Sequence, residues 1–307
     1  MNIVFAPSEF NPGTNGVSLA IGVFDGVHLG HQTVIGQACE SARQTGAASA
    51  VVTFGCHPNA VVAPGHVPPL IYPLSKKLRV IASLGVDTTL VIHFDKAFSE
   101  ITGEEFIRGL HRQAGALRAI CVGETFQFGH RRSGNVALLR KLGGELGIEV
   151  HALPDVSLDG QPVSSTRIRE AIRAGQFEVA SRLLGRPYSL CGKVIFGAGF
   201  GKKLGFPTAN LDIEGTLTPP AGVYSAEALA GGETYKAAVN VGHRPTVQSG
   251  GAGLSVEAHL LNFSGGGLYG QEIELTFLKK LRDERKFPSV DALREQIARD
   301  VAAVAAS

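Results

Sequence analysis

Two histidines stand three residues apart near the start of the chain, in the motif Gly22-Val-Phe-Asp-Gly-Val-His28-Leu-Gly-His31. An apolar run typical of a buried strand precedes them, and a helix is expected to begin at the histidines. Residues three apart on a helix share one face, and a helix start offers free N–H groups and a positive dipole end that favour phosphate. The motif therefore predicts that His28 and His31 stabilise a phosphorus centre that gains negative charge. The alternative is a pair that only caps the helix or is solvated.

A glycine-rich segment, from Phe196 to Asn210, is a second candidate for binding phosphate. Its glycines at positions 197, 199, 201 and 205 allow the backbone to approach a phosphate closely, and Lys202 and Lys203 add positive charge. Thr208 and Asn210 supply neutral oxygens that can share one Mg²⁺ with water and phosphate oxygens. The spacing fits neither a Walker A loop nor a dinucleotide fingerprint, so a plain glycine-rich hairpin is the alternative.

Three further groups carry candidate chemistry. Glu257 alternates with apolar residues, and it is a candidate general base for a hydroxyl if its strand face lines a ligand site rather than solvent. His57 follows an apolar run and is expected at the same crevice as the two histidines. The segment Ser164-Ser-Thr-Arg-Ile-Arg169 combines hydroxyls, a helix start and a guanidinium, which together suit pyrophosphate. Its alternative is an ordinary capped helix on which Arg169 is exposed.

The elements that must position these groups alternate between strand and helix as far as about residue 155. This rhythm predicts a doubly wound parallel sheet, with the loops 24–30, 54–64 and 123–134 facing one crevice. The expected strands are 19–24, 50–54, 89–94, 119–122 and 149–153, and the expected helices are 31–45, 75–84, 104–113 and 135–146.

After two helices up to residue 184, short β-type runs and glycine turns predict a compact antiparallel barrel. Its expected strands are 189–196, 222–229, 236–241, 255–261 and 272–277, followed by a helix at 290–303. The sequence thus predicts two domains, 1–185 and 186–307.

Composition limits the class of protein. The 307 residues are 44% hydrophobic and 18% charged, so the chain can bury a core. A net charge of +2 without a run of Lys or Arg argues against nucleic-acid binding. Short apolar runs and an N-terminus without a basic region predict neither a membrane span nor a signal peptide. Four widely spaced cysteines predict a cytoplasmic protein without a zinc site or disulfides. The oligomeric state stays open.

Taken together and in order, these segments resemble the bacterial bifunctional riboflavin kinase/FAD synthetase family over nearly the whole chain. The motif at 22–31 and the segment 163–169 resemble the two signatures of its nucleotidylyltransferase-like first domain. Its riboflavin kinase domain is resembled by Lys203-Leu-Gly-Phe-Pro-Thr-Ala-Asn210, Pro220-Ala-Gly-Val-Tyr224, Asn240-Val-Gly-His-Arg-Pro-Thr246, Val256-Glu257, Leu268-Tyr-Gly270 and the ending 277–287.

The resemblance implies two ATP-dependent reactions. In the barrel, riboflavin would attack the γ-phosphate of ATP, with Glu257 as base and with Mg²⁺ and phosphates positioned by Thr208 and Asn210. In the first domain, FMN would attack the α-phosphate of a second ATP, and His28 and His31 would stabilise the transition state. The implied ATP- or phosphate-binding residues are Gly22, Phe24, Asp25, Gly26, Ser164, Ser165, Thr166, Arg169, Gly197, Gly199, Gly201, Lys203 and Pro207, and the implied flavin-binding residues are His57, Phe126, Phe128 and Arg282.

The chain also departs from the family pattern, mostly in the first domain. Gly55 and Cys56 stand where the family usually has an acidic residue and proline, and Thr125 stands where Asp or Asn is usual. Phe200 replaces a common basic residue. These departures leave open a riboflavin kinase with a weakened adenylyltransferase domain. Two further alternatives are a flavin-binding module without turnover and a nucleotidylyltransferase for another phosphate ester. The attached kinase-like barrel argues against the last of these.

Overall fold

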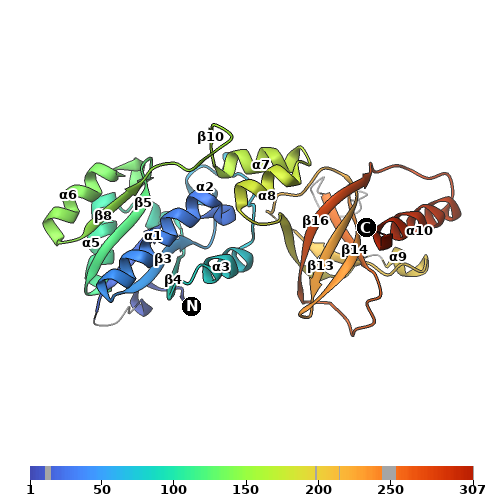
Figure 1. Ribbon diagram of the computed structural model, residues 1–307, viewed down its shortest axis with the longest axis horizontal. Helices are drawn as coiled ribbons and strands as arrows, with labels where there is room; N and C mark the ends of the chain where they lie inside the picture. The colour runs from blue at the N-terminus through green and yellow to red at the C-terminus, as the bar shows by residue number, and fades with distance from the viewer. Residues whose placement is uncertain (11–14, 198, 214, 244–253, 307) are drawn as a thin grey trace. The chain divides into compact units, whose positions relative to one another are not determined.

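The computed structural model describes residues 1–10, 15–197, 199–213, 215–243 and 254–306. Contacts within the chain divide it into two compact units (Figure 1). The first unit is Met1–Leu70 with Leu74–Ser165, and the second is Ile71–Pro73 with Thr166–Ser307. This division groups residues 166–185 with the second unit, whereas we expected a domain boundary near residues 185–188.

A parallel sheet forms the centre of the first unit. Across the described residues its six strands follow the order β1-β4-β3-β2-β5-β8, and neighbouring strands are parallel. The order reverses beside β2, where such sheets bind ligands outside the carboxyl ends of their strands. This topology confirms the predicted doubly wound sheet. The strands are β1 (Asn2–Val4), β2 (Val17–Ile21), β3 (Ala48–Phe54), β4 (Thr88–Ile92), β5 (Leu117–Gly123) and β8 (Glu149–Leu153).

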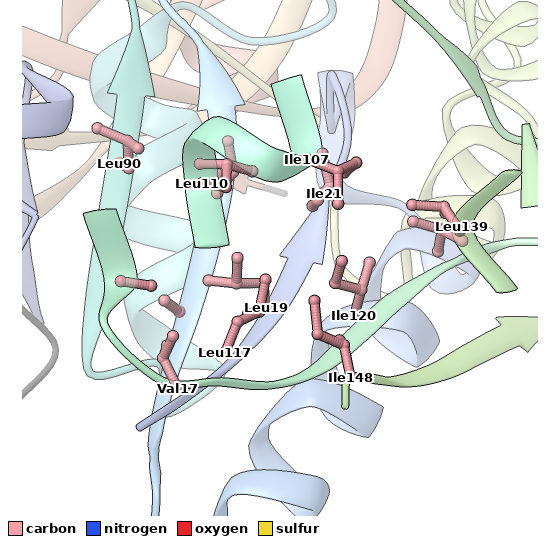
Figure 2. Close-up of a cluster of buried hydrophobic side chains, with 14 of the residues drawn as sticks. Val17, Leu19, Ile21, Leu90, Ile107, Leu110, Leu117, Ile120, Leu139 and Ile148 are labelled. Atoms are coloured by element: carbon pink, nitrogen blue, oxygen red, sulfur yellow. The ribbon is translucent and has the colours of Figure 1, made fainter. Parts of the chain in front are cut away.

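The sheet is covered on both faces, so β2 is buried along its whole length. Figure 2 shows Val17, Leu19 and Ile21, which alternate along β2, in one cluster with Ile107 and Leu110 of α5 (Gly103–Ala114). On the opposite face Ser18 and Ser41 of α1 (Leu29–Thr45) share a hydrogen bond of 3.1 Å. Because both faces of the sheet are covered, the edge formed by the carboxyl ends of its strands is where polar side chains can gather.

Shorter elements complete the first unit, and most predicted helices are confirmed within a few residues. The remaining helices are α2 (Asn59–Val62), α3 (Leu74–Ser83), α4 (Lys96–Ser99) and α6 (Val136–Leu146). Single 3₁₀ turns occur at Pro7–Glu9, Asp25–Val27, Pro64–His66 and His130–Arg132, and two small hairpins pair β6 (Gln127–Phe128) with β7 (Gly134–Asn135) and β9 (Ser157–Leu158) with β10 (Gln161–Pro162).

Antiparallel strands close into a barrel in the second unit, which confirms the prediction. Among the described residues the barrel has six strands in the order β11-β12-β15-β14-β13-β16, and closure leaves no unpaired edge. The strands are β11 (Ser189–Ile195), β12 (Ala209–Asp212), β13 (Gly222–Ala230), β14 (Glu233–His243), β15 (Leu254–Leu260) and β16 (Glu272–Arg282), and the helices are α7 (Ser165–Arg173), α8 (Phe177–Leu184), α9 (Phe200–Lys203) and α10 (Val290–Ala306).

Aromatic packing explains why α8 belongs to the second unit. Phe177, at the start of α8, has its ring centroid 5.8 Å from Tyr188, 5.7 Å from Tyr224 and 5.4 Å from Phe277, which lie on or next to barrel strands. The Tyr224 hydroxyl donates to the carbonyl of Pro220 at 2.6 Å, so this buried polar tip is satisfied. The helix thus contributes a core residue to the barrel.

We expect Phe177→Ala to lower the free energy of unfolding of the second unit by about 3–5 kcal/mol, because it leaves a cavity among these rings. The chain has no tryptophan and its five tyrosines all lie in the second unit, so tyrosine fluorescence during urea unfolding reports on that unit alone. Phe196→Ala is the matched control, since Phe196 is largely exposed. A loss below about 1 kcal/mol for Phe177→Ala would show that α8 packs loosely.

Candidate active sites

The histidine motif lies just beyond the carboxyl end of β2, at the start of α1. Positive φ angles at Phe24 (51°) and Gly26 (76°) turn the chain sharply between strand and helix. His28 is the N-cap of α1, and its Nδ1 accepts a hydrogen bond from the backbone N–H of His31 at 3.3 Å. A neutral imidazole whose Nδ1 accepts carries its proton on Nε2, so Nε2–H is the donor that His28 can offer a phosphate.

The two imidazoles are stacked, with ring centroids 3.5 Å apart and planes inclined by 18°. Phe24 lies edge-on to His31 at 5.2 Å. Glycines leave the room for this packing, because a Cβ at Gly30 would lie 3.3 Å from the His28 ring and one at Gly22 would lie 2.9 Å from the Phe24 ring. The structure therefore brings the two predicted histidines together, and their catalytic role stays a prediction.

The predicted pyrophosphate segment begins beside the same turn. Ser165, the first residue of α7, donates its hydroxyl to the carbonyl of Asp25 at 3.1 Å. Ser164 immediately precedes the helix and Thr166 lies in its first turn. Arg169 is only 7% exposed, which contradicts the solvent-exposed Arg169 of the alternative, and the role of the segment in binding pyrophosphate stays a prediction.

An apolar cavity of about 500 Å³ opens beyond the carboxyl ends of β2 and β3 in the first unit. Phe126 and Phe128, predicted to bind flavin, both line it and stack at 5.1 Å. His57 does not line this cavity, although its neighbour Pro58 does, and the Nδ1 of His57 accepts from the N–H of Asn59. Four phenylalanines that we did not single out continue the chain of ring contacts along the cavity: Phe54, Phe94, Phe98 and Phe106.

A buried lysine that sequence reasoning missed holds the loops that follow β2 and β3. The Nζ of Lys77, on α3, donates to the carbonyl oxygens of Val23 at 3.2 Å and Phe54 at 2.8 Å, and to the hydroxyl of Thr53 at 3.1 Å. Thr53 in turn donates to the carbonyl of Val23 at 3.0 Å. The sequence did carry one signal for its burial: Lys77 falls at helical spacing between the apolar residues Leu74 and Ile81.

Burial lowers the pKa of Lys77 to about 8, and the nearby charge of Asp25 partly opposes that shift. In the unfolded chain this lysine has an ordinary pKa of about 10.4. The unfolded chain therefore binds more protons than the folded chain between about pH 8 and 10.4. We expect the free energy of unfolding of the wild type to rise over this window, by up to about 3 kcal/mol, relative to Lys77→Met. Calorimetric unfolding from pH 7 to 10.5 measures this difference.

Lys141→Met is the control for the pH series, because the Lys141 side chain is 66% exposed. Its difference from wild type should not change with pH. A pH-independent difference for Lys77→Met as well would contradict the lowered pKa.

The second predicted site lies on adjacent barrel strands. Glu257 of β15 is paired across the sheet with Asn210 of β12 on one side and Asn240 of β14 on the other. Its Oε2 accepts a hydrogen bond from the hydroxyl of Thr208 at 3.4 Å. The structure thus places the predicted base beside both predicted metal-binding residues. Glu257 lines a cavity, so it is not the solvent-facing glutamate of the alternative interpretation.

The glycine-rich loop folds closely over these residues. A Cβ at Gly197 would lie 2.2 Å from the amide nitrogen of Asn210, and one at Gly201 would lie 2.5 Å from the carbonyl oxygen of Phe206. Gly199 has φ of 67° and precedes α9, which ends at the exposed Lys203. The carbonyl of Pro207 is engaged by Nδ1 of His259 at 2.8 Å. Glycine is therefore needed here for space as well as for backbone conformation.

A cavity of about 720 Å³ lies in the second unit between the barrel and α10. Its polar end carries Glu257, Thr208 and Asn240, and Arg282 also lines it. Apolar side chains also line it, among them Leu204, Phe206, Phe287, Leu293 and Ile297, together with charged residues of the segment after β16. Residues 244–246 of the predicted kinase motif lie outside the described part of the chain.

The donor set of the barrel site fits Mg²⁺. A hydroxyl, an amide oxygen and a single carboxylate are hard oxygen ligands, which Mg²⁺ combines with water and substrate phosphates. Within the described residues no group of three or more His, Cys, Asp or Glu side chains gathers as a metal site. Thr208 and Asn210 offer oxygens that a metal ion could share with water and substrate phosphates, and this role stays a prediction.

Comparison with known proteins follows the same division of the chain. The family model for FAD synthetase matches residues 11–167, and the model for riboflavin kinase matches residues 184–307. The chain is 36% identical over 302 residues to the bifunctional riboflavin kinase/FMN adenylyltransferase of Haemophilus influenzae, covering 98% of this chain and 97% of that protein. It is 35% identical over 286 residues to that of Bacillus subtilis, covering 92% and 89%.

A solved structure shares the fold. The crystal structure described as a macrolide-efflux protein from Streptococcus pneumoniae matches with a TM-score of 0.82 and 29% identity, over 99% of both chains. In the part of the chain that the structure describes, no helix is long and apolar enough to cross a membrane. With both family models matched and near full-length relatives above 30% identity, this chain belongs to the bifunctional riboflavin kinase/FMN adenylyltransferase family.

Proposed function

We propose that this chain makes FAD from riboflavin in two steps, each of which consumes one ATP. The observation that carries the proposal is the Glu257 carboxylate beside the Thr208 hydroxyl, in a cavity that Phe206, Phe287 and apolar side chains of α10 also line. This arrangement suits a flavin ring with a hydroxyl-bearing tail, and a module that only binds flavin has no need of a base beside a phosphate site.

In the kinase step, Glu257 takes the proton of the riboflavin 5′-hydroxyl as its oxygen attacks the γ-phosphorus of ATP. The bond from the γ-phosphorus to the bridging oxygen breaks, and FMN and ADP result. The glycine-rich loop binds phosphates with its backbone N–H groups, and Thr208 and Asn210 would hold Mg²⁺, which would supply charge neutralisation. The apolar wall formed with α10 orients the flavin ring.

In the adenylyltransferase step, an oxygen of the FMN phosphate attacks the α-phosphorus of a second ATP, and pyrophosphate leaves. The Nε2–H of His28, the second imidazole of His31 and the N–H groups at the start of α1 stabilise the charge that develops there. Ser164, Ser165, Thr166 and Arg169 hold the leaving pyrophosphate. The phenylalanine-lined cavity of the first unit holds the FMN ring.

We assign the riboflavin kinase activity to residues 186–307 and the FMN adenylyltransferase activity to residues 1–185. The family models leave residues 168–183 unmatched, and compactness groups these residues with the barrel. All four cysteines carry free thiols, which supports a reducing, cytoplasmic location. Riboflavin, FMN and ATP are then the small-molecule partners.

A chromatographic product profile tests the proposal directly. Purified protein receives Mg²⁺-ATP with riboflavin in one reaction and with FMN in the other. FAD in both reactions is the expected result. FMN without FAD would favour a kinase whose first domain is inactive, and would direct attention to Thr125, which stands next to Phe126 of the cavity. The absence of both FMN and FAD would overturn the proposal.

A further inference from the structure

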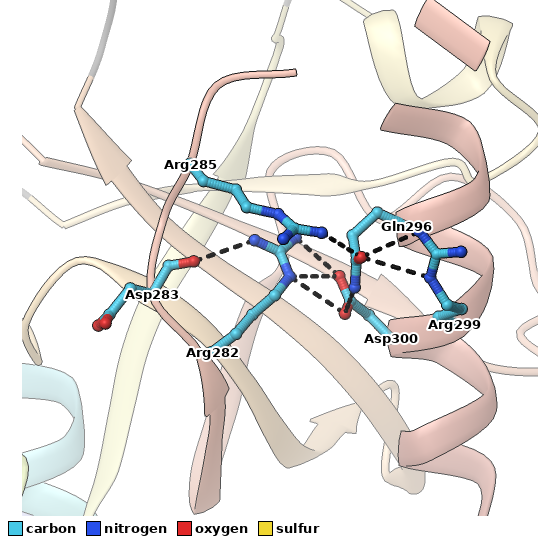
Figure 3. A network of polar contacts seen from close by, with 6 residues as sticks. All are labelled: Arg282, Asp283, Arg285, Gln296, Arg299 and Asp300. Atoms are coloured by element: carbon cyan, nitrogen blue, oxygen red, sulfur yellow. Dashed lines mark hydrogen bonds and ion pairs between the residues drawn. The ribbon is translucent and has the colours of Figure 1, made fainter. Parts of the chain in front are cut away.

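Arg282 ends β16 and lines the kinase cavity, but its guanidinium is already engaged by α10. Figure 3 shows that its Nε donates to both carboxylate oxygens of Asp300, at 3.1 and 3.0 Å, and its Nη2 donates to Oδ2 at 2.8 Å. The Nη1 donates to the backbone carbonyl of Asp283 at 3.0 Å. Such a forked pair fixes the plane of the guanidinium as well as its position.

The carboxylate of Asp300 is itself held in place. Its side chain is 9% exposed, and Gln296, one turn earlier on α10, donates from Nε2 to its Oδ1 at 2.8 Å. The Oε1 of Gln296 accepts from Arg285 and Arg299, so the amide cannot rotate freely (Figure 3). A continuous set of hydrogen bonds thereby joins the end of β16, the following segment and α10.

This network determines the shape of one wall of the cavity. Leu293 and Ile297 project from α10 into the cavity at helical spacing, and Asp300 follows on the same side of the helix. Phe287, in the segment between β16 and α10, also lines the cavity and lies under the guanidinia of Arg282 (5.6 Å) and Arg285 (5.0 Å). The ion pair thus connects the end of β16 to the apolar residues that α10 contributes to this wall.

The pair also changes what Arg282 can do. Asp300 neutralises its charge and takes up the Nε edge of the fork, so Arg282 is poorly suited to act as a free counter-ion for ATP phosphates. An ion pair removed from water seldom adds net stability over an apolar pair of similar volume. We therefore look for the role of this pair in the position that it gives to Arg282. What remains available to a ligand is a fixed planar group beside Phe287 and the apolar side chains of α10.

We propose that Asp300 is a positioning residue for riboflavin: by holding Arg282, it fixes the wall formed by Phe287 and α10 against the flavin ring. The inference rests on the proposed kinase function of the barrel. It assigns the Arg282–Asp300 pair to flavin binding and not to the transfer of the phosphoryl group, which takes place at Glu257.

The test compares Asp300→Asn with wild type by calorimetric titration of riboflavin without ATP and by steady-state kinetics. The substitution keeps the shape and removes the charge that pairs with Arg282. We expect the riboflavin Kd and KM to rise at least about tenfold, because a partly buried guanidinium loses its partner. The kcat, the KM for ATP and the conversion of FMN to FAD should stay within about threefold. Asp291→Asn, on an exposed position of the same helix, should resemble wild type.

A double variant separates positioning from folding. Arg282→Met with Asp300→Met removes the charges together, and tyrosine fluorescence checks that the second unit still unfolds cooperatively. If Asp300 acts through Arg282, the double variant should bind riboflavin no more weakly than Arg282→Met alone. Additive losses, a fall in kcat with unchanged riboflavin Kd, or wild-type affinity in Asp300→Asn would each overturn the proposal. A wild type that binds no riboflavin would instead refute the kinase assignment itself.

Discussion

Glu257→Gln lowers the rate of riboflavin phosphorylation by at least about a hundredfold, while FAD formation from added FMN continues at the wild-type rate. Glutamine keeps the size and hydrogen-bonding shape of the side chain, so Thr208 still has an acceptor within reach. What is lost is the carboxylate that, in the proposed mechanism, takes the proton of the attacking hydroxyl. The measurement is initial velocity with riboflavin and with FMN, quantified by chromatography.

Glu227→Gln is the matched control for this prediction, because Glu227 lies on β13 of the same barrel and is exposed. It should leave both reactions unchanged. Kinase turnover of Glu257→Gln within a few-fold of wild type would mean that Glu257 only organises Thr208, Asn210 and Asn240. The loss of FAD formation as well would mean that the variant is misfolded or that the two units are not independent.

His28→Ala produces the opposite pattern: FMN still forms from riboflavin, and FAD formation falls by about a hundredfold to a thousandfold. The substitution removes the Nε2–H that His28 can present to the α-phosphate and leaves the barrel untouched. The readout is FAD produced from FMN and ATP, together with the FMN that accumulates when riboflavin is the substrate.

His28 also caps α1, so alanine alone does not separate catalysis from helix stability. Loss of an N-cap costs about 1 kcal/mol, and asparagine is among the best N-cap residues. His28→Asn should therefore restore the stability of the helix without restoring FAD formation. Wild-type FAD formation in His28→Asn would show that the histidine acts only as a cap.

The regular parts of both folds could be predicted because their patterns are long. The apolar run before Gly22 and the alternation around Glu257 correspond to strands of the sheet and the barrel. The strands β1 (Asn2–Val4) and β12 (Ala209–Asp212) were not predicted, since three or four residues carry too little periodicity and are held by pairing with distant partners. The end of β16 was also missed, because its last residues alternate poorly.

The candidate sites show the same limit. Groups adjacent in sequence, such as His28 with His31 or Thr208 with Asn210, could be named from their spacing. Lys77 could not, because its three oxygen partners come from other segments and a lysine is ordinarily expected on the surface. Asp300 could not either, since only the folded barrel brings α10 to Arg282.

The six phenylalanines around the first cavity bear on the photochemistry of a flavin bound there. An excited flavin readily takes an electron from tyrosine or tryptophan, whereas a phenylalanine ring is much harder to oxidise. The chain has no tryptophan, and none of its five tyrosines belongs to the first unit. A flavin bound among Phe126, Phe128 and their neighbours, as we propose for FMN, would therefore have no tyrosine or tryptophan of that unit as an electron donor.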